Sequence, residues 1–283
     1  MSDQPSSGRS GPSASELQPA LARLLRPLVR LMIRSGITFP ALSDTLREVY
    51  VSVAEKEFAL RAKPQTDSRV SLLTGVHRKE VRRLREAGVP VSETPAMVSR
   101  SSLILAHWLG SPDFTDTAGE PRPLHRFSDG PDGPGFDSLV AAVTRDVRPR
   151  AVLDELLEQE IVSLDDEGRV HLLATALVPS RDMDALSYYF GRNLHDHLAA
   201  AVENLAGRTP AFLERAVHYE GLSEATTVAL EAKSRELALA ALQAANREAL
   251  AARAEEPSGE GSVRDWRWTF GLYIFRERTQ PKP

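Results

Sequence analysis

The sequence predicts a mostly α-helical protein that ends in a small domain of mixed helix and strand. Three observations lead to this prediction. Apolar residues recur every three or four positions through the first 60 residues, and an Ala-rich stretch with helical spacing spans 222–255. Aromatic and branched residues alternate with other types over 266–276, which is typical of a strand. Helical spacing therefore dominates, and strand spacing is confined to short segments.

The N-terminal part is predicted to be helical after a disordered tail. Residues 1–15 are rich in Ser, Gly and Pro, a composition that does not build a core. Helices are expected over 17–35 and 39–61, because both stretches carry an apolar stripe. A further helix at 97–109 is expected to close the same domain. The sequence thus predicts one helical domain over 16–110.

Residues 67–85 are predicted to form a helix, a glycine turn and a second helix that carries many cations. Gly75 lies where the chain turns and positive φ is needed. His77 and Glu80 stand at the positions of an N-cap and its reciprocal partner. The positions expected to lock the two helices together and form the turn are Ser71, Gly75, Val76, Val81 and Leu84, with Val70 also facing inward.

The segment Leu-Thr-Gly-Val-His-Arg-Lys-Glu-Val within this stretch resembles the helix-turn-helix of bacterial transcription regulators. More loosely, the whole chain resembles an uncharacterised bacterial family whose members carry this motif. The resemblance implies that the second helix enters the major groove of double-stranded DNA. Its long cations reach phosphates, and an arginine can fork onto guanine. The expected DNA-binding residues are His77, Arg78, Lys79, Arg82, Arg83 and Arg85. A helical hairpin with a solvated basic face is the alternative.

Charge is divided unevenly along the chain. The net charge is −4, but residues 1–100 hold 16 Lys/Arg and 10 Asp/Glu, a net of +6. Residues 101–283 hold 19 Lys/Arg and 29 Asp/Glu, a net of −10. Such asymmetry favours contact of the basic half with a polyanion. The chain has no Cys, which fits a cytoplasmic protein, and it has no apolar run of membrane-spanning length.

A winged-helix-like module is predicted over 111–178. Its expected elements are helices over 136–143 and 150–159, then strands over 161–164 and 169–173. Helix, helix and hairpin in that order resemble a winged-helix domain. The second of these helices carries Asp154, Glu155 and Glu158, which would repel phosphates. We therefore expect this module to pack or to contact protein rather than to read DNA.

Residues 179–283 are predicted to form a small α+β domain. Its expected elements are helices over 182–206 and 222–255 and strands over 212–220 and 266–276. The long Ala-rich helix is a candidate surface for a homodimer, and packing within its own domain is the alternative. The aromatic strand is expected to face a core, since large aromatic side chains mostly serve packing, although such rings also stack on single-stranded bases.

No catalytic residue, metal site or cofactor is expected. His195 and His197 stand two apart, whereas a metal-binding pair on a helix needs a spacing of four. No nucleophile elbow or phosphate loop occurs. The sequence therefore favours a DNA-binding transcriptional regulator over an enzyme, with no effector indicated. The rival hypotheses are a protein-interaction adaptor whose helix-turn-helix is only a fold element, and a ligand sensor or enzyme with a C-terminal site.

Overall fold

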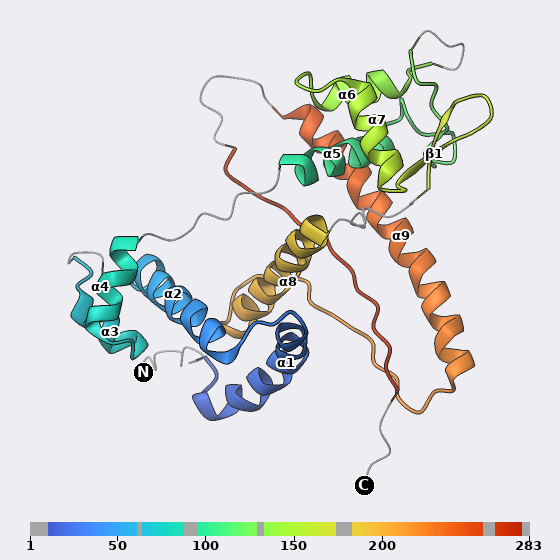
Figure 1. The fold of residues 1–283 in the computed structure, drawn as a ribbon. Helices are drawn as coiled ribbons and strands as arrows, with labels where there is room; N and C mark the ends of the chain where they lie inside the picture. The colour runs from blue at the N-terminus through green and yellow to red at the C-terminus, as the bar shows by residue number, and fades with distance from the viewer. Residues whose placement is uncertain are drawn as a thin grey trace, which may run out of the picture. The chain divides into compact units, whose positions relative to one another are not determined.

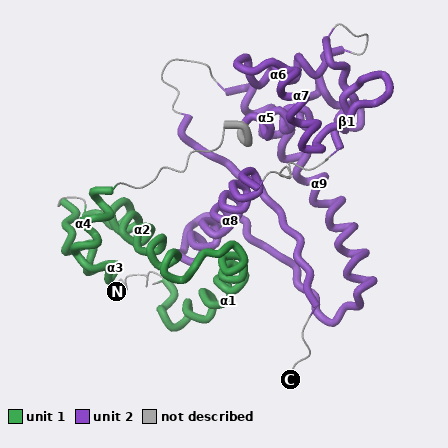
Figure 2. The backbone as a smooth tube through the Cα atoms, viewed as in Figure 1, with its two compact units in different colours: residues 1–93 green, residues 94–283 purple. Residues whose placement is uncertain are grey.

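The computed structural model describes residues 11–60, 64–87, 96–128, 133–173, 183–256 and 264–278, without the side chains of 96–99. The chain is mostly helical, as predicted, with one two-stranded sheet in the described ranges (Figure 1). It divides into two compact units, Met1–Glu93 and Thr94–Pro283, which are described separately (Figure 2).

The first unit begins with two long helices, α1 (Ala14–Arg34) and α2 (Phe39–Glu57). Ser13 caps α1: its hydroxyl accepts from the Glu16 N–H, and its own N–H donates to the Glu16 carboxylate at 2.7 Å. The helix therefore starts inside the stretch predicted to be a tail, and residues 1–10 of that stretch lie outside the described residues. Helix α2 ends four residues earlier than the predicted boundary at 61.

Two short helices complete the first unit, α3 (Asp67–Thr74) and α4 (Arg78–Ala87). They pack with α2 around a small apolar core. Its buried members are Val51, Ala54, Val70, Val81 and Leu84, with Val76 packed against them. Helix α1 has no buried residue, so this core rests on α2, α3 and α4 alone.

The second unit begins with three helices and a hairpin. These are α5 (Ala96–Gly110), α6 (Phe136–Val143), α7 (Pro149–Glu158), β1 (Val162–Leu164) and β2 (Val170–Leu172). The strands are antiparallel, with Val162 opposite Leu172. Leu124, between α5 and α6, exchanges backbone hydrogen bonds of 3.0 and 2.7 Å with Val170, which extends the sheet on the other side of β2.

Helix α5 packs in the second unit, although the sequence places it in the first. Trp108 is fully buried, its ring lies edge-on to Phe136 with centroids 6.1 Å apart, and its Nε1–H donates to the Arg122 carbonyl oxygen at 3.1 Å. Ile104 is also fully buried in the same cluster. Large apolar side chains on α5 require an extensive core, and the second unit supplies it.

The last two helices are α8 (Met183–Leu205) and α9 (Glu224–Glu255), close to their predicted bounds. Helix α9 packs on α5, where the Asn246 amide donates to the Ala106 carbonyl oxygen at 2.8 Å. The strands predicted at 212–220 and 266–276 are extended but join no sheet, so the α+β prediction for this part is not met in the described residues. No helix in the described ranges is long and apolar enough to cross a membrane.

Candidate nucleic-acid interface

The turn between α3 and α4 is closed by local hydrogen bonds. Gly75 ends α3 in the left-handed region with φ of 72°, and its N–H donates to the Ser71 carbonyl oxygen at 2.9 Å. The Thr74 hydroxyl donates to the Val70 carbonyl oxygen at 2.7 Å and accepts from the Val76 N–H at 3.2 Å. Positive φ strains any residue with a Cβ, so glycine suits this position. Gly75 lies in the turn where the sequence places it.

His77 caps the start of α4. Its carbonyl oxygen accepts from the Glu80 and Val81 N–H groups at 2.8 and 3.0 Å, and its Nδ1 accepts from the Lys79 N–H at 3.3 Å. The imidazole Nδ1 therefore accepts the hydrogen bond that a capping side-chain oxygen would otherwise accept. The Glu80 carboxylate is not the reciprocal partner expected from the sequence, because it accepts two hydrogen bonds from Arg83 at 3.0 and 2.6 Å.

The two faces of α4 differ sharply. Val81 is fully buried and Leu84 is nearly so, and both lie against the α2–α3 core. Ser71, on α3, is half-buried. The cations of α4 at positions 78, 79, 82 and 83 are all exposed. The inward face fixes the orientation of the helix, and the outward face carries the charge.

Two of the four outward cations pair with carboxylates on the same helix. Arg82 contacts Glu86 at 2.9 Å, and Arg83 contacts Glu80 at 2.6 Å. The hydrogen bonds from Arg83 lower the pKa of Glu80, and Glu80 in turn raises the pKa of Arg83. The Arg82 and Arg83 side chains are 73% and 61% exposed. Exposed pairs at this spacing contribute little to stability, so either arginine can exchange its partner for a phosphate.

Arg78 and Lys79 occupy the first turn of α4. Both are exposed, and neither forms an ion pair with any side chain in the described ranges. Cations at a helix N-terminus are unfavourable against the helix dipole, so these two positions gain nothing electrostatically within the unit. A bound polyanion would remove that penalty. The first turn of the helix therefore presents two cations available to a ligand.

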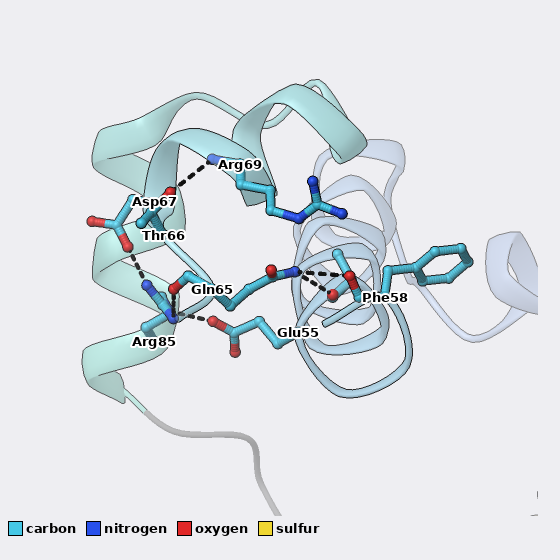
Figure 3. Close-up of polar contacts among 8 residues, drawn as sticks. Glu55, Phe58, Gln65, Thr66, Asp67, Arg69 and Arg85 are labelled. Carbon is cyan, nitrogen blue, oxygen red and sulfur yellow. Dashed lines mark hydrogen bonds and ion pairs between the residues drawn. The ribbon is translucent and has the colours of Figure 1, made fainter. Parts of the chain in front are cut away.

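Arg85 is engaged inside the unit rather than on the outward face. Its guanidinium forms ion pairs with Glu55 on α2 and Asp67 on α3, and it donates to the Gln65 carbonyl oxygen at 2.8 Å (Figure 3). The Asp67 hydrogen bond is the main reason that its pKa is raised. The side chain is 32% exposed. Arg85, assigned to DNA contact from the sequence, therefore ties α4 to α2 and α3.

Sequence reasoning missed Gln65 and Glu55. The Gln65 amide donates to the Ala54 carbonyl oxygen at 2.8 Å and to that of Phe58 at 3.5 Å, which caps the end of α2 (Figure 3). Glu55 and Gln65 lie outside the 67–85 segment, so no local spacing connects them with Arg85. Within α2, Glu55 lies one turn after the buried Val51, and this spacing places its half-buried carboxylate beside the core.

His195 and His197 form separate contacts. His195 lies 2.9 Å from the Asp196 carboxylate, and His197 lies 3.5 Å from that of Glu214. Across the part of the chain that the structure describes, no three His, Asp or Glu side chains meet in an arrangement that could hold a metal ion.

A family model described as a family of unknown function, DUF6502, matches residues 14–282. No curated protein and no solved structure matches the chain. The match spans both units, including the α3–α4 pair and the extended C-terminal segments.

Proposed function

The chain belongs to the DUF6502 family, and we propose that it is a sequence-specific DNA-binding protein, a transcriptional regulator whose α4 helix enters the major groove. One observation carries the proposal: four exposed cations occupy the outward face of α4, while Val81 and Leu84 hold its inward face in the core. A helix that is anchored on one side and cationic on the other suits a groove lined by phosphates.

The local geometry supports a helix-turn-helix. A short helix, a left-handed glycine and a second short helix follow one another, and α2 covers both of them. In this motif the N-terminal residues of the second helix contact base edges. Arg78 and Lys79 lie at those positions, and Arg82 and Arg83 follow one turn later. We assign base reading to one or two of these four cations and phosphate contact to the others.

Arg85 has a different role in this proposal. Because its guanidinium is already bound by two carboxylates and a carbonyl oxygen, we assign it to holding the α4 helix in place. His77 likewise acts as a cap, through its Nδ1 and carbonyl oxygen. The residues that we assign to DNA contact are therefore the four cations Arg78, Lys79, Arg82 and Arg83.

The order of elements in the second unit supports the proposal of a winged-helix module. Helix α5, the bridging residue Leu124, α6, α7 and the β1–β2 hairpin follow the order of that fold. However, the exposed face of α7 carries Asp154 and Glu158, and the hairpin turn carries Asp166 and Glu167. These carboxylates disfavour contact with phosphate. This acidic surface favours a protein partner, and an adaptor that uses only this surface is the second candidate function.

A titration of the full chain tests DNA binding. A labelled mixed-sequence duplex is titrated at two salt concentrations with the wild type, with a Lys79→Gln/Arg83→Gln variant, and with a matched Arg145→Gln/Arg150→Gln control from the second unit. We expect binding that weakens with salt, and a slope of log K against log salt that falls by about 0.9 for each phosphate contact removed. The control should behave as the wild type.

Absence of binding at low salt would contradict the proposal. Equal loss in the α4 variant and the control would also contradict it, because affinity would then follow total charge instead of the α4 face.

A further inference from the structure

Two extended segments of the second unit expose large apolar side chains. They are residues 211–222, between α8 and α9, and residues 264–278, after α9 (Figure 1). The exposed fractions are 86% for Leu213, 87% for Val217, 79% for Tyr219, 95% for Trp266 and 65% for Trp268. Several large apolar side chains exposed on the same segments mark an interaction site.

Segment 264–278 is held firmly along α8. Arg267 donates to both carboxylate oxygens of Asp196, at 2.6 and 2.8 Å, and the Thr269 hydroxyl donates to the same carboxylate at 2.8 Å. The Tyr273 ring lies 5.5 Å from that of His197. These contacts fix both the position of the segment and the direction in which its side chains point.

The alternation of this segment turns its apolar face away from α8. Arg267, Thr269 and Tyr273 contact α8, so the side chains between them point to the opposite side of an extended chain. That opposite side carries Trp266, Trp268, Phe270, Leu272 and Ile274, each between 37% and 95% exposed. The predicted apolar face exists and is only partly covered: Arg276, on the same side, pairs with Glu231 of α9, and Trp266 and Trp268 remain its most exposed rings.

Much of the backbone of both segments lacks hydrogen bonds to other backbone groups, whereas the Phe212 N–H and C=O, at the start of the first segment, bond to the Asn204 amide. Over 213–222 and 265–276, no backbone group forms a backbone-to-backbone hydrogen bond with any described residue. Exposed extended chain with free N–H and C=O groups is a template for pairing with another strand. Because one segment carries both an apolar face and an open backbone edge, we expect its partner to be another extended strand.

We propose that segments 211–222 and 264–278 pair with the same two segments of a second copy of the chain to form the core of a homodimer. The two segments carry opposite net charge, −1 for 211–222 and +2 for 264–278, so one copy holds both complementary halves. In a two-fold symmetric dimer, segment 211–222 of each copy pairs with segment 264–278 of the other copy. The inference does not depend on DNA binding.

The available area matches what a dimer needs. A stable interface buries about 800 Å² on each partner. Each large aromatic side chain buries about 150–250 Å². The exposed rings of Tyr219, Trp266 and Trp268, together with the aliphatic residues of both segments, supply a large part of that area.

Sedimentation equilibrium of the full chain tests the interface. Leu272→Glu places a charge on the outward face, and Leu72→Glu makes the same change at an exposed position of the first unit. We expect a wild-type dimer at micromolar concentration, at least tenfold weaker association for Leu272→Glu, and a dimer for the control. Both leucines are exposed in the single chain, so each variant should retain the wild-type far-UV circular dichroism. A monomeric wild type, or equal association of both variants, would overturn the proposal.

Cysteine pairing separates contact between copies from contact within one chain. The chain has no Cys, so Val217→Cys and Phe270→Cys each introduce a single reactive site. The two singly substituted proteins are mixed and treated with a short bismaleimide, and the doubly substituted protein is treated alone. A product that joins the two different chains supports the proposal. A product confined to single chains of the double variant, with none in the mixture, would overturn it.

Discussion

Arg85 on α4 forms an ion pair with Glu55 on α2 and thereby connects the cation-bearing helix to the helix that covers it. One Glu55 carboxylate oxygen is buried and accepts no hydrogen bond of good geometry from the described residues. The ion pair with Arg85 is therefore the main interaction that offsets its loss of water. Removal of the guanidinium would leave a largely desolvated carboxylate without its partner. Arg85 is therefore expected to matter more for stability than for ligand contact.

Arg85→Ala should lower the free energy of unfolding of the first unit by about 1–2 kcal/mol, a value reduced for the partial exposure of the side chain. Arg82→Ala is the matched control, because its one partner is an exposed carboxylate on the same helix. Urea unfolding, with hydrogen exchange of the α3 and α4 amides as the probe, measures the free energy of unfolding of both variants. Equal effects of the two substitutions would contradict the structural role of Arg85.

The four outward cations should differ in DNA binding. Replacing a base-reading residue among Arg78, Lys79, Arg82 and Arg83 by Ala should weaken the preferred duplex by about tenfold or more and relax specificity at one base pair. Replacing a phosphate-contacting residue should weaken all duplexes alike. Competition titrations with single-base variants of the preferred duplex separate the two cases. If all four substitutions leave affinity unchanged, α4 does not face DNA.

Gly75→Val should destabilise the first unit chiefly through backbone strain, because Gly75 has a φ of 72°. Apart from the adjacent residues, no atom lies within 4 Å of the position that a Cβ would occupy at Gly75, so a Cβ there meets open space. Left-handed backbone costs a β-branched residue about 1–2 kcal/mol or more. Gly75→Asn, which tolerates positive φ better, is the control and should cost less. An unchanged melting temperature for the valine variant would contradict the strained turn.

The sequence predicted features that depend on neighbours within one or two turns. Gly75, Val81 and Leu84 follow local spacing, and the structure places them in the turn and the core. The role of Arg85 could not be predicted in this way, because its partners Glu55 and Gln65 lie on or beside another helix. Outward direction on a helical wheel does not reveal a carboxylate that approaches from elsewhere in the fold.

Long-range packing explains the other differences. Helix α5 carries helical spacing that fits either unit, and only its contact with residues such as Phe136 assigns it to the second. The alternation over 266–276 indicated an extended chain with an apolar face, and the structure has both. Alternation does not specify a pairing partner, so the sheet expected within the chain could not be inferred from it.

Acid should release segment 264–278 from α8. Burial raises the pKa of Asp196, but hydrogen bonds from Arg267, His195 and Thr269 together outweigh burial, so that the pKa lies well below its usual range. The stabilisation from a depressed carboxylate pKa is complete above the unfolded value of about 3.9 and is lost as pH falls further. The proposed dimer should therefore weaken as pH falls below about 4.

Asp196→Asn provides the control for this acid effect. The variant should associate more weakly at neutral pH, because the charged contact with Arg267 is lost, and its association should vary less with pH below the usual aspartate range. Sedimentation across the acidic range measures both proteins. Parallel pH profiles for the wild type and the variant would assign the acid response to other groups.

Selection of duplexes from a random pool by the full chain determines whether α4 reads DNA sequence. We expect one enriched motif for the wild type and for the Arg145→Gln/Arg150→Gln control, and loss of that enrichment for Lys79→Gln/Arg83→Gln. Failure of the wild type to enrich any sequence, or an identical motif from the α4 variant, would contradict it.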